Sequence, residues 1–316
     1  MMAPMDQHTN EQTVFTDKIM VFLAPYGIKP SLRDVESFSK QLIECWANEA
    51  SYRKLLRARW YGAASQTMDI LHFLKDAWDS GRADEAFWCA FLAAHFGRAS
   101  ANLSRPNEVK SAGRFLCAFG DKPTWTWTYV SANRNAFADQ LVAHKKDLET
   151  LRFGNHRKYC SKKPQELARV VTDFVQWVDD YGGSPSAAFA LPQGRTAQQS
   201  FGELFRRFTV YSFGRTGRFD LLNLLSQTGL LNIQADSCYL PGSSGPLDGA
   251  KLLCGTHDIK KLSEIIDSLA RSLSIPYDVM EDALCIWQKK PGKQTAGHPP
   301  SVSNPHFIPL QTIHRK

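Results

Sequence analysis

The chain has 316 residues, 43% of them hydrophobic and 22% charged, which is typical of a globular protein with one large domain or two small lobes. Its 38 Lys and Arg residues against 31 Asp and Glu residues give a net charge of +7, which weakly favours a polyanionic partner. The seven scattered cysteines form no Cys-x-x-Cys pair and no run of about 18 apolar residues occurs, so composition excludes a disulfide framework, a zinc site and a membrane-spanning helix.

Apolar residues recur at helical spacing along most of the chain. Asp84 follows Gly81 as an expected N-cap, and Gly182 and Gly183 are expected to end the helix before them. The sequence therefore predicts an all-α fold. The predicted helices span residues 31–58, 67–78, 84–95, 135–151, 165–181, 201–225 and 259–273.

Residues 124–130 depart from this pattern, because Thr residues alternate there with Trp125, Trp127 and Tyr129. Such alternation suits a strand or an extended loop. A single strand makes no sheet, so we expect at most a minor strand element. The three aromatic side chains are candidate walls of a base-binding pocket, although aromatic residues more often belong to a core.

Stretches rich in Gly, Ser and Pro suggest how the chain is divided. Residues 182–194 are expected to form a hinge between two helical lobes. The predicted parts are an N-terminal segment 1–30, a helical lobe 31–183, a second lobe 184–290 and an irregular tail 291–316.

The most informative stretch is a glycine-bearing turn, Leu240-Pro-Gly-Ser-Ser-Gly245, which we expect to join two helices. The second helix should start just after Pro246. Glycines permit positive φ angles and close approach of a phosphate, and freed N–H groups at a helix start form an anion site. The alternative is a capped turn without a ligand. The residues expected to contact a DNA backbone are Gly242, Ser243, Ser244, Gly245, Lys251, Arg215 and Arg218.

Three carboxylates follow Pro276 on the next predicted helix. Asp278, Glu281 and Asp282 share a face, and their mutual repulsion can raise one pKa. Breaking an N-glycosidic bond builds positive charge on the sugar, which a carboxylate stabilises while it activates water. We therefore treat all three as catalytic candidates. The alternative is an ordinary acidic first turn favoured by the helix dipole.

A second set of residues is suited to substrate binding. His95 ends an apolar helix, and residues 155–159 combine an amide, an imidazole, two cations and a phenol. Such groups suit phosphate or sugar contacts, with Tyr159 able to stack on a base. The alternatives are a helix cap for His95 and a solvated basic turn. The candidate substrate-binding residues are His95, Asn155, His156, Arg157, Lys158, Tyr159 and Lys289.

The glycine-bearing turn resembles the helix-hairpin-helix of DNA glycosylases, Leu-Pro-Gly-x-Gly, with one extra residue and serines at its centre. The resemblance implies two helical lobes and a catalytic aspartate at the start of a later helix, where Asp278 stands. Bifunctional members carry a nucleophilic lysine at the position of Leu247. Its absence implies hydrolysis by a monofunctional enzyme.

Further strings resemble clade 3 of the α-glutamyl/putrescinyl thymine pyrophosphorylases, whose name comes from phage enzymes that attach amines to activated pyrimidines in DNA. An anti-phage DNA glycosylase of this clade removes α-glucosyl-hydroxymethylcytosine from phage DNA, and the resemblance implies that activity here. Related domains tend to have histidine at the position of Asp282, which weakens its assignment. The matching strings are residues 87–98, 154–159, 201–205 and 214–220, the turn, and Leu284-Cys285 with Lys289.

Three hypotheses remain open. The first is the glycosylase, which would leave abasic sites in double-stranded phage DNA by flipping a modified base. The second is a transferase for thymine hypermodification that acts on pyrophosphorylated hydroxymethyluracil, and the third is a non-catalytic helical DNA-binding protein. We expect a cytoplasmic protein, because residues 1–16 lack an apolar signal sequence. We also expect a monomer that needs no metal or cofactor and contacts no membrane.

Overall fold

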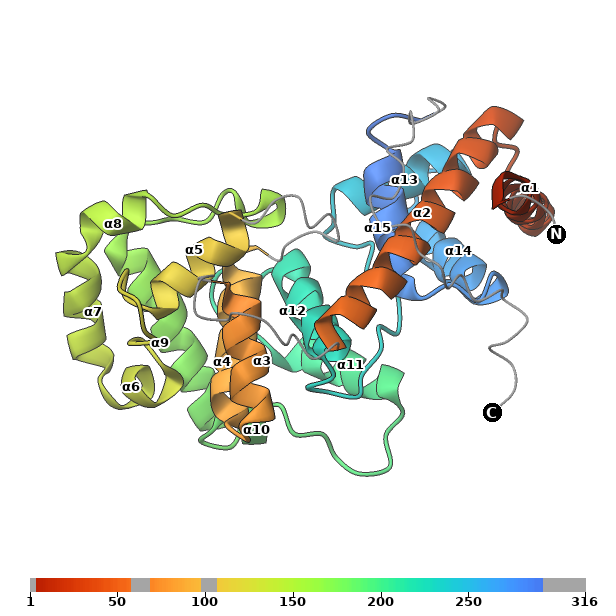
Figure 1. Ribbon diagram of the computed structural model, residues 1–316. Coiled ribbons are helices and arrows are strands. Elements are labelled where there is room, and N and C mark those ends of the chain that lie inside the picture. Colours follow the sequence, from red (N-terminus) through yellow and green to blue (C-terminus); the bar gives the residue numbers. More distant parts are fainter. Residues whose placement is uncertain (1–3, 58–68, 98–106, 292–316) are drawn as a thin grey trace.

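Helices and the loops between them make up the protein over residues 4–57, 69–97 and 107–291, which the computed structural model describes (Figure 1). No strand occurs in these ranges, so the predicted all-α fold class is confirmed. The α-helices are α1 (Pro4–Leu23), α2 (Leu32–Arg57), α3 (Ile70–Asp79), α4 (Ala83–Phe96), α5 (Asn107–Leu116), α6 (Trp127–Ala132), α7 (Arg134–Ala143), α8 (Lys145–Glu149), α9 (Pro164–Asp180), α10 (Pro185–Ala188), α11 (Ala197–Arg207), α12 (Arg215–Thr228), α13 (Gly245–Cys254), α14 (Ile259–Ser272) and α15 (Tyr277–Trp287). Two 3-10 turns are η1 (Ala24–Tyr26) and η3 (Asn155–Arg157).

The first hydrophobic core is built around α4. This helix is apolar on nearly every side, and all its residues from Ala86 to Phe96 are buried. Trp88 and Phe91 stack on Phe174 of α9, with ring centroids 5.9 and 3.9 Å apart. The core draws its side chains from α3 through α12, and α4 packs against α3, α5 and α12.

The second core is assembled from both ends of the chain. It combines α1 and α2 with α13, α14 and α15. Along α14, Leu262, Ile266 and Leu269 form the buried stripe that the sequence predicted. Figure 1 shows these five helices together at one end of the molecule, with α12 between them and the first core. α2 packs against both α15 and α12, so the two cores meet along these three helices.

A glycine brings α13 and α15 into direct contact. A Cβ atom at Gly249 would overlap the carbonyl oxygen of Leu284, a backbone atom that cannot move aside on its own. The close crossing holds the start of α13 next to α15, and with it the glycine-bearing turn.

Residues 124–130, for which a strand or an extended loop was expected, instead lead into α6, which begins at Trp127. Thr126 caps α6 by accepting a hydrogen bond from the N–H of Tyr129 at 3.2 Å. Glu85 of α4 accepts from the N–H groups of Trp127 and Thr128 at 2.9 and 3.1 Å, so a distant carboxylate satisfies the first turn of a short helix. The side chains of Trp125 and Trp127 are buried in the first core, which makes them core residues and not pocket walls.

Asp84 does not cap α4 as expected, because Arg82 holds the N-cap position. The Asp84 carboxylate instead accepts a hydrogen bond from the N–H of Ser186 at 2.8 Å, which ties α10 to α4. The segment predicted as a hinge, residues 182–194, thus contains α10. The predicted division into lobes stays a prediction.

The connection before α13 is longer than a tight hairpin. The predicted helix 201–225 is two helices, α11 and α12, and α12 ends at Thr228. An irregular segment from residue 229 to residue 244 then leads to α13. The second helix starts at Gly245, next to the predicted Pro246. Of the predicted tail, residues 292–316 lie outside the described residues.

Two expectations about the chemistry of the chain can be compared with the structure. All seven cysteines are free, as the scattered spacing suggested. Within the described ranges, no helix combines the length and the apolar character that crossing a membrane requires.

Candidate functional site

The seam between the two cores brings charged side chains together from three elements. Arg215 and Asp220 come from α12, Glu281 and Cys285 from α15, and His156 from η3. We call these five residues the seam cluster. Asp220 and Glu281 are both buried, and a buried carboxylate requires compensating charge or hydrogen bonds.

Arg215 supplies that charge to Glu281. Its Nη1 lies 2.5 Å from Oε1 of Glu281, and its other nitrogens donate to the carbonyl oxygens of Cys238 and Tyr239 at 2.5 and 2.7 Å. Burial raises the pKa of Glu281, and the charge of Asp220 adds to this effect, while Arg215 and His156 oppose it. The result is a carboxyl group whose pKa lies above its ordinary value.

His156 is the most exposed member of the cluster. Its Nδ1 lies 3.2 Å from Oδ2 of Asp220, and 46% of its side chain is exposed. Hydrogen bonds with Asp220 and Cys285, and the charge of Asp220, raise the pKa of His156 to about 11. At neutral pH it is therefore an imidazolium that pairs with Asp220 while about half of its side chain stays exposed.

The three predicted acids do not converge on one point. Only Glu281 belongs to the seam cluster. Asp278 is buried against α2, where its Oδ2 accepts from Nη2 of Arg53 at 2.8 Å, and Arg53 also pairs with Glu49 at 2.8 Å. Asp282 is half-buried, and its charge contributes to the raised pKa of Cys45 on α2. Asp278 and Asp282 thus both face α2.

A cavity of about 340 Å³ adjoins the seam cluster, with His156 in its wall. We call it the histidine pocket. Tyr159, a predicted substrate-binding residue, lies at its rim and is 87% exposed, with Nζ of Lys158 4.9 Å from its ring centroid. The lining residues are His95, His156, Arg157, Tyr159, Cys160, Ser161, Glu166, Val170, Tyr211 and Ser212.

Glycines fix the loop that carries His156. The N–H of Gly154 donates to the carbonyl oxygen of Phe96 at 2.7 Å, and a Cβ atom at Gly97 would lie only 2.7 Å from Cα of Gly154. A Cβ atom at Gly217 would lie 2.6 Å from Nη1 of Arg157. Three of the strings that carry the family resemblance therefore meet here, and their glycines are explained by close packing.

The glycine-bearing turn lies beside the seam cluster. Gly242 has φ +78°, and a Cβ atom added there would lie 3.8 Å from Cβ of Arg215. A Cβ atom at Gly245 would lie 2.6 Å from Sγ of Cys285, so that glycine is needed for packing against α15. The N–H and the hydroxyl group of Ser243 both donate hydrogen bonds to the carbonyl oxygen of Leu240, at 3.0 and 2.7 Å.

The remaining predicted contacts are dispersed. Ser244 is the N-cap of α13 without a side-chain hydrogen bond to it, and Lys251 pairs with Asp248 at 3.1 Å. Arg218 donates to the carbonyl oxygen of Phe205 at 3.1 Å, and Lys289 is exposed at the end of α15. The side chain of Asn155 lies outside the described residues.

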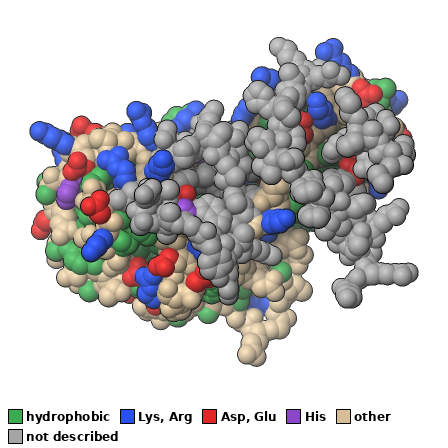
Figure 2. Space-filling view, in the orientation of Figure 1, with side chains coloured by type: hydrophobic (Ala, Val, Ile, Leu, Met, Phe, Trp, Pro, Cys, Tyr) green, Lys and Arg blue, Asp and Glu red, His purple; other side chains and the backbone are tan. Residues whose placement is uncertain are grey.

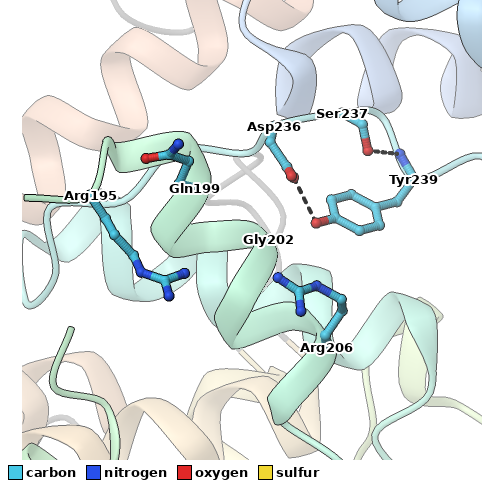
Figure 3. A pocket seen from close by; sticks show the side chains of 7 residues that line it. All are labelled: Arg195, Gln199, Gly202, Arg206, Asp236, Ser237 and Tyr239. Atoms are coloured by element: carbon cyan, nitrogen blue, oxygen red, sulfur yellow. Dashed lines mark hydrogen bonds between the residues drawn. The ribbon is translucent and has the colours of Figure 1, made fainter. Parts of the chain in front are cut away.

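A larger cavity, of about 520 Å³, lies between α11 and the segment that carries Asp236 and Tyr239 (Figure 3). Figure 3 shows Arg195 and Arg206 reaching toward it from the side of α11, opposite Asp236 and Tyr239. The Tyr239 hydroxyl donates to Oδ1 of Asp236 at 2.6 Å, while its carbonyl oxygen binds Arg215. Gly202, which lines this cavity, lies in the string 201–205 that carries the family resemblance, but that string did not indicate a cavity.

Several functional candidates were missed by sequence reasoning. Asp220 ends one of the strings that carry the family resemblance, and Cys285 shares the acidic face of α15. The sequence pattern therefore drew attention to both residues but indicated no function for either. Glu166 and Tyr211 line the histidine pocket but lie in segments without a distinctive pattern.

Exposed basic side chains lie on the same segment of the chain as His156. Arg152, Lys158 and Lys163 are exposed on the segment between α8 and α9, which also carries His156. Figure 2 shows that Lys and Arg side chains elsewhere on one face of the molecule are interspersed with Asp and Glu. The segment between α8 and α9 therefore combines positive charge with access to the seam cluster.

No curated protein and no solved structure matches this chain. A family match covers residues 38–296, which include the seam cluster, the histidine pocket and the glycine-bearing turn. It confirms the resemblance seen in the sequence. The chain belongs to the family described as alpha-glutamyl/putrescinyl thymine pyrophosphorylase clade 3.

Proposed function

We propose that the protein is a DNA glycosylase that hydrolyses the N-glycosidic bond of a bulky modified pyrimidine. The substrate we assign is α-glucosyl-hydroxymethylcytosine in phage DNA, and the role is antiviral defence. Family membership supports an enzyme that acts on modified pyrimidines. The observation that carries the proposal is the approach of two buried carboxylates, Asp220 and Glu281, to a half-exposed imidazolium at a cavity wall.

The charges of the seam cluster suit the transition state of glycosidic cleavage. When the C1′–N1 bond breaks, its electron pair stays on the base and positive charge develops on the deoxyribose. The carboxylates of Asp220 and Glu281 stabilise that positive charge. His156, with a pKa of about 11, is charged at neutral pH and donates a proton to the departing pyrimidine.

Water completes the reaction. Arg215 holds Oε1 of Glu281, and we assign the second oxygen to the attacking water. Its raised pKa makes this carboxylate a better proton acceptor than an ordinary glutamate. The water oxygen bonds to C1′, its proton passes to Glu281, and solvent restores both groups. The products are a free base and an abasic sugar.

The DNA strand would be held by the residues around the pocket. The exposed cations Arg152, Lys158 and Lys163 supply phosphate contacts, and the backbone of Gly242 gives a second point of approach. Tyr159 presents its ring at the rim, where a base next to the flipped nucleotide can stack on it.

A second candidate function is transfer of an amine to pyrophosphorylated hydroxymethyluracil in DNA. The family description favours it, because it names a thymine pyrophosphorylase. Arg206 and Arg195, the latter also paired with Glu203, line the larger cavity and supply positive charge toward a pyrophosphate leaving group.

These functions are separated by incubating the protein with phage DNA that carries or lacks glucosylated hydroxymethylcytosine and identifying the products by mass spectrometry. We expect free glucosylated base and an alkali-sensitive strand only from the modified DNA. Glu281→Gln should lower the rate of base release by about 100-fold or more, because the variant cannot accept a proton from water. Glu264→Gln, at an exposed position on α14, is the matched control and should leave the rate unchanged.

The other outcomes are equally clear. Release of no free base from glucosylated DNA would reject the glycosylase. Pyrophosphate release with attachment of an amine to pyrophosphorylated DNA would identify the transferase. Retention of DNA without any product would leave a binding protein.

A further inference from the structure

His95 occupies an unusual position at the end of α4. Only 2% of the residue is exposed, and its ring lies between aromatic side chains, with Phe153 edge-on at 5.5 Å and Phe213 stacked at 6.0 Å between centroids. The seam cluster does not include it, yet its side chain forms part of the wall of the histidine pocket.

Arg157 fixes the tautomer of this imidazole. Its Nη2 lies 3.2 Å from Nδ1 of His95, and its Nε donates to the carbonyl oxygen of the same residue at 3.1 Å. A guanidinium can only donate, so Nδ1 accepts and the proton of the neutral ring sits on Nε2. Burial and the charge of Arg157 both lower the pKa of His95, which keeps the ring neutral.

The Nε2–H group is then a buried donor without an acceptor among the residues that the structure describes. Buried polar groups are almost always paired, and His95 is one of the residues that line the histidine pocket, so its unpaired donor points to a ligand that supplies the acceptor. Arg157 is a poorer hydrogen-bond donor to such a ligand, because its Nη1 already donates to the carbonyl oxygen of Ser212 at 2.8 Å.

The pocket lining includes further polar groups, Glu166, Tyr211 and Ser161 among them. Glu166 presents a carboxylate oriented by the Tyr211 hydroxyl at 2.9 Å, and Ser161 has a hydroxyl whose oxygen already accepts from the N–H of Lys163 at 3.2 Å. A hydroxyl group donates and accepts at once, so a ligand with several hydroxyls matches this lining. The cavity volume of about 340 Å³ is in the range of small-ligand sites.

We propose that the histidine pocket receives the sugar substituent of the modified base, and that His95 donates a hydrogen bond from Nε2 to one of its oxygens. This inference rests on the proposed function for its substrate, but not on the chemistry of cleavage. His95 is then a specificity-determining residue that distinguishes a glycosylated pyrimidine from one with a bare hydroxymethyl group.

Two substitutions separate this role from support of Arg157. In His95→Asn the side-chain oxygen stands near the place of Nδ1 and keeps an acceptor for Arg157, but no donor reaches the place of Nε2. In His95→Gln the amide nitrogen reaches the place of Nε2, while the Nδ1 acceptor is lost. The measurement is the equilibrium affinity for one duplex carrying either α-glucosyl-hydroxymethylcytosine or hydroxymethylcytosine, with thermal denaturation to verify folding.

We expect the wild type to prefer the glucosylated duplex and His95→Asn to lose about tenfold of that preference, as for one lost hydrogen bond. His95→Gln should retain most of the preference. Equal affinity of the wild type for both duplexes would overturn the proposal, and so would a preference retained by Asn and lost by Gln, which would leave His95 as a positioning residue for Arg157.

A measurement on the wild type does not depend on the variants. The imidazole N–H proton of His95 should shift in the NMR spectrum when the glucosylated duplex is added, and should not shift with the hydroxymethylated one. An unchanged resonance with both duplexes would reject the contact. If the wild type releases no base but keeps the His95-dependent preference, the glycosylase proposal fails and the sugar pocket stands.

Discussion

At the scale of single residues, the identity of the neighbours decides what each carboxylate can do. The helical pattern correctly groups Asp278, Glu281 and Asp282 on the first turns of α15. It cannot tell which of them faces α2 and which faces α12, because that depends on how distant helices pack around α15. Glu281 differs from the other two acids because it is buried and interacts with Arg215 and His156. The local spacing of residues along α15 does not reveal these distant neighbours.

The charge of Arg215 gives a pH-dependent prediction. Glu281 must be ionised to accept a proton from water, so kcat/KM should rise with pH through the pKa of this group. Arg215 lowers that pKa. Arg215→Met should therefore move the acidic limb of the profile to higher pH, measured as base release across a pH series.

Arg215→Lys provides the comparison, because it keeps the positive charge and loses the hydrogen bonds to the Cys238 and Tyr239 carbonyl oxygens. The acidic limb of this variant should stay near that of the wild type, even if its thermal midpoint falls. An acidic limb that is the same in all three proteins would show that Glu281 is not the group that titrates.

At the scale of elements, helices with a sustained apolar spacing were predictable, whereas the 20-residue α1 and the six-residue α6 were not. The helix predicted at 165–181 is α9, because its apolar spacing continues over several turns. α6 was missed because its stability depends on Glu85, a residue that lies far from it in sequence. The glycine-bearing turn was recognised, but the purpose of Gly245 was not, since only the packed structure reveals Cys285 behind it.

The contact between α13 and α15 gives a prediction for stability. Gly249→Ala would place a methyl group onto the carbonyl oxygen of Leu284, so the helices must separate. We expect a loss of about 2 kcal/mol or more in the free energy of unfolding, as for other overpacked cores. Denaturant unfolding measures it.

Gly120→Ala is the control for that substitution, because its nearest contact would be at an ordinary 3.4 Å. It should change the free energy of unfolding by less than about 0.5 kcal/mol, as surface substitutions generally do. Equal stability of the Gly249 variant and the wild type would mean that α13 and α15 do not touch as described.

At the scale of the whole molecule, the net charge of +7 indicated a polyanionic partner but not where it binds. The structure collects exposed cations on the segment between α8 and α9, next to His156. The fold class was predictable from periodicity, whereas the joining of the two chain ends into one core was not, because it depends on contacts between residues more than 200 positions apart, such as the one at 2.8 Å between Ser37 and Trp287.

DNA binding should therefore depend on salt through a few definite residues. The logarithm of the affinity should fall by about 0.9 per phosphate contact for each log unit of salt. The double variant Lys158→Gln, Lys163→Gln should reduce this slope by up to about 1.8, which titrations over a salt series measure. The pair Lys260→Gln, Lys261→Gln on α14 carries the same change of charge and should leave the slope unaltered.

The second core joins α1 and α2 to helices that begin after residue 244, while the fully buried side chains of the first core, among the described residues, lie between Ile70 and Ala235. During synthesis on the ribosome, α1 and α2 emerge first, but α13, α14 and α15, against which they pack, are synthesised last. The middle of the chain can fold in the meantime. We therefore expect His156 and Asp220 to take their places before Glu281 does, so that the charged groups of the seam cluster come together only when α15 docks.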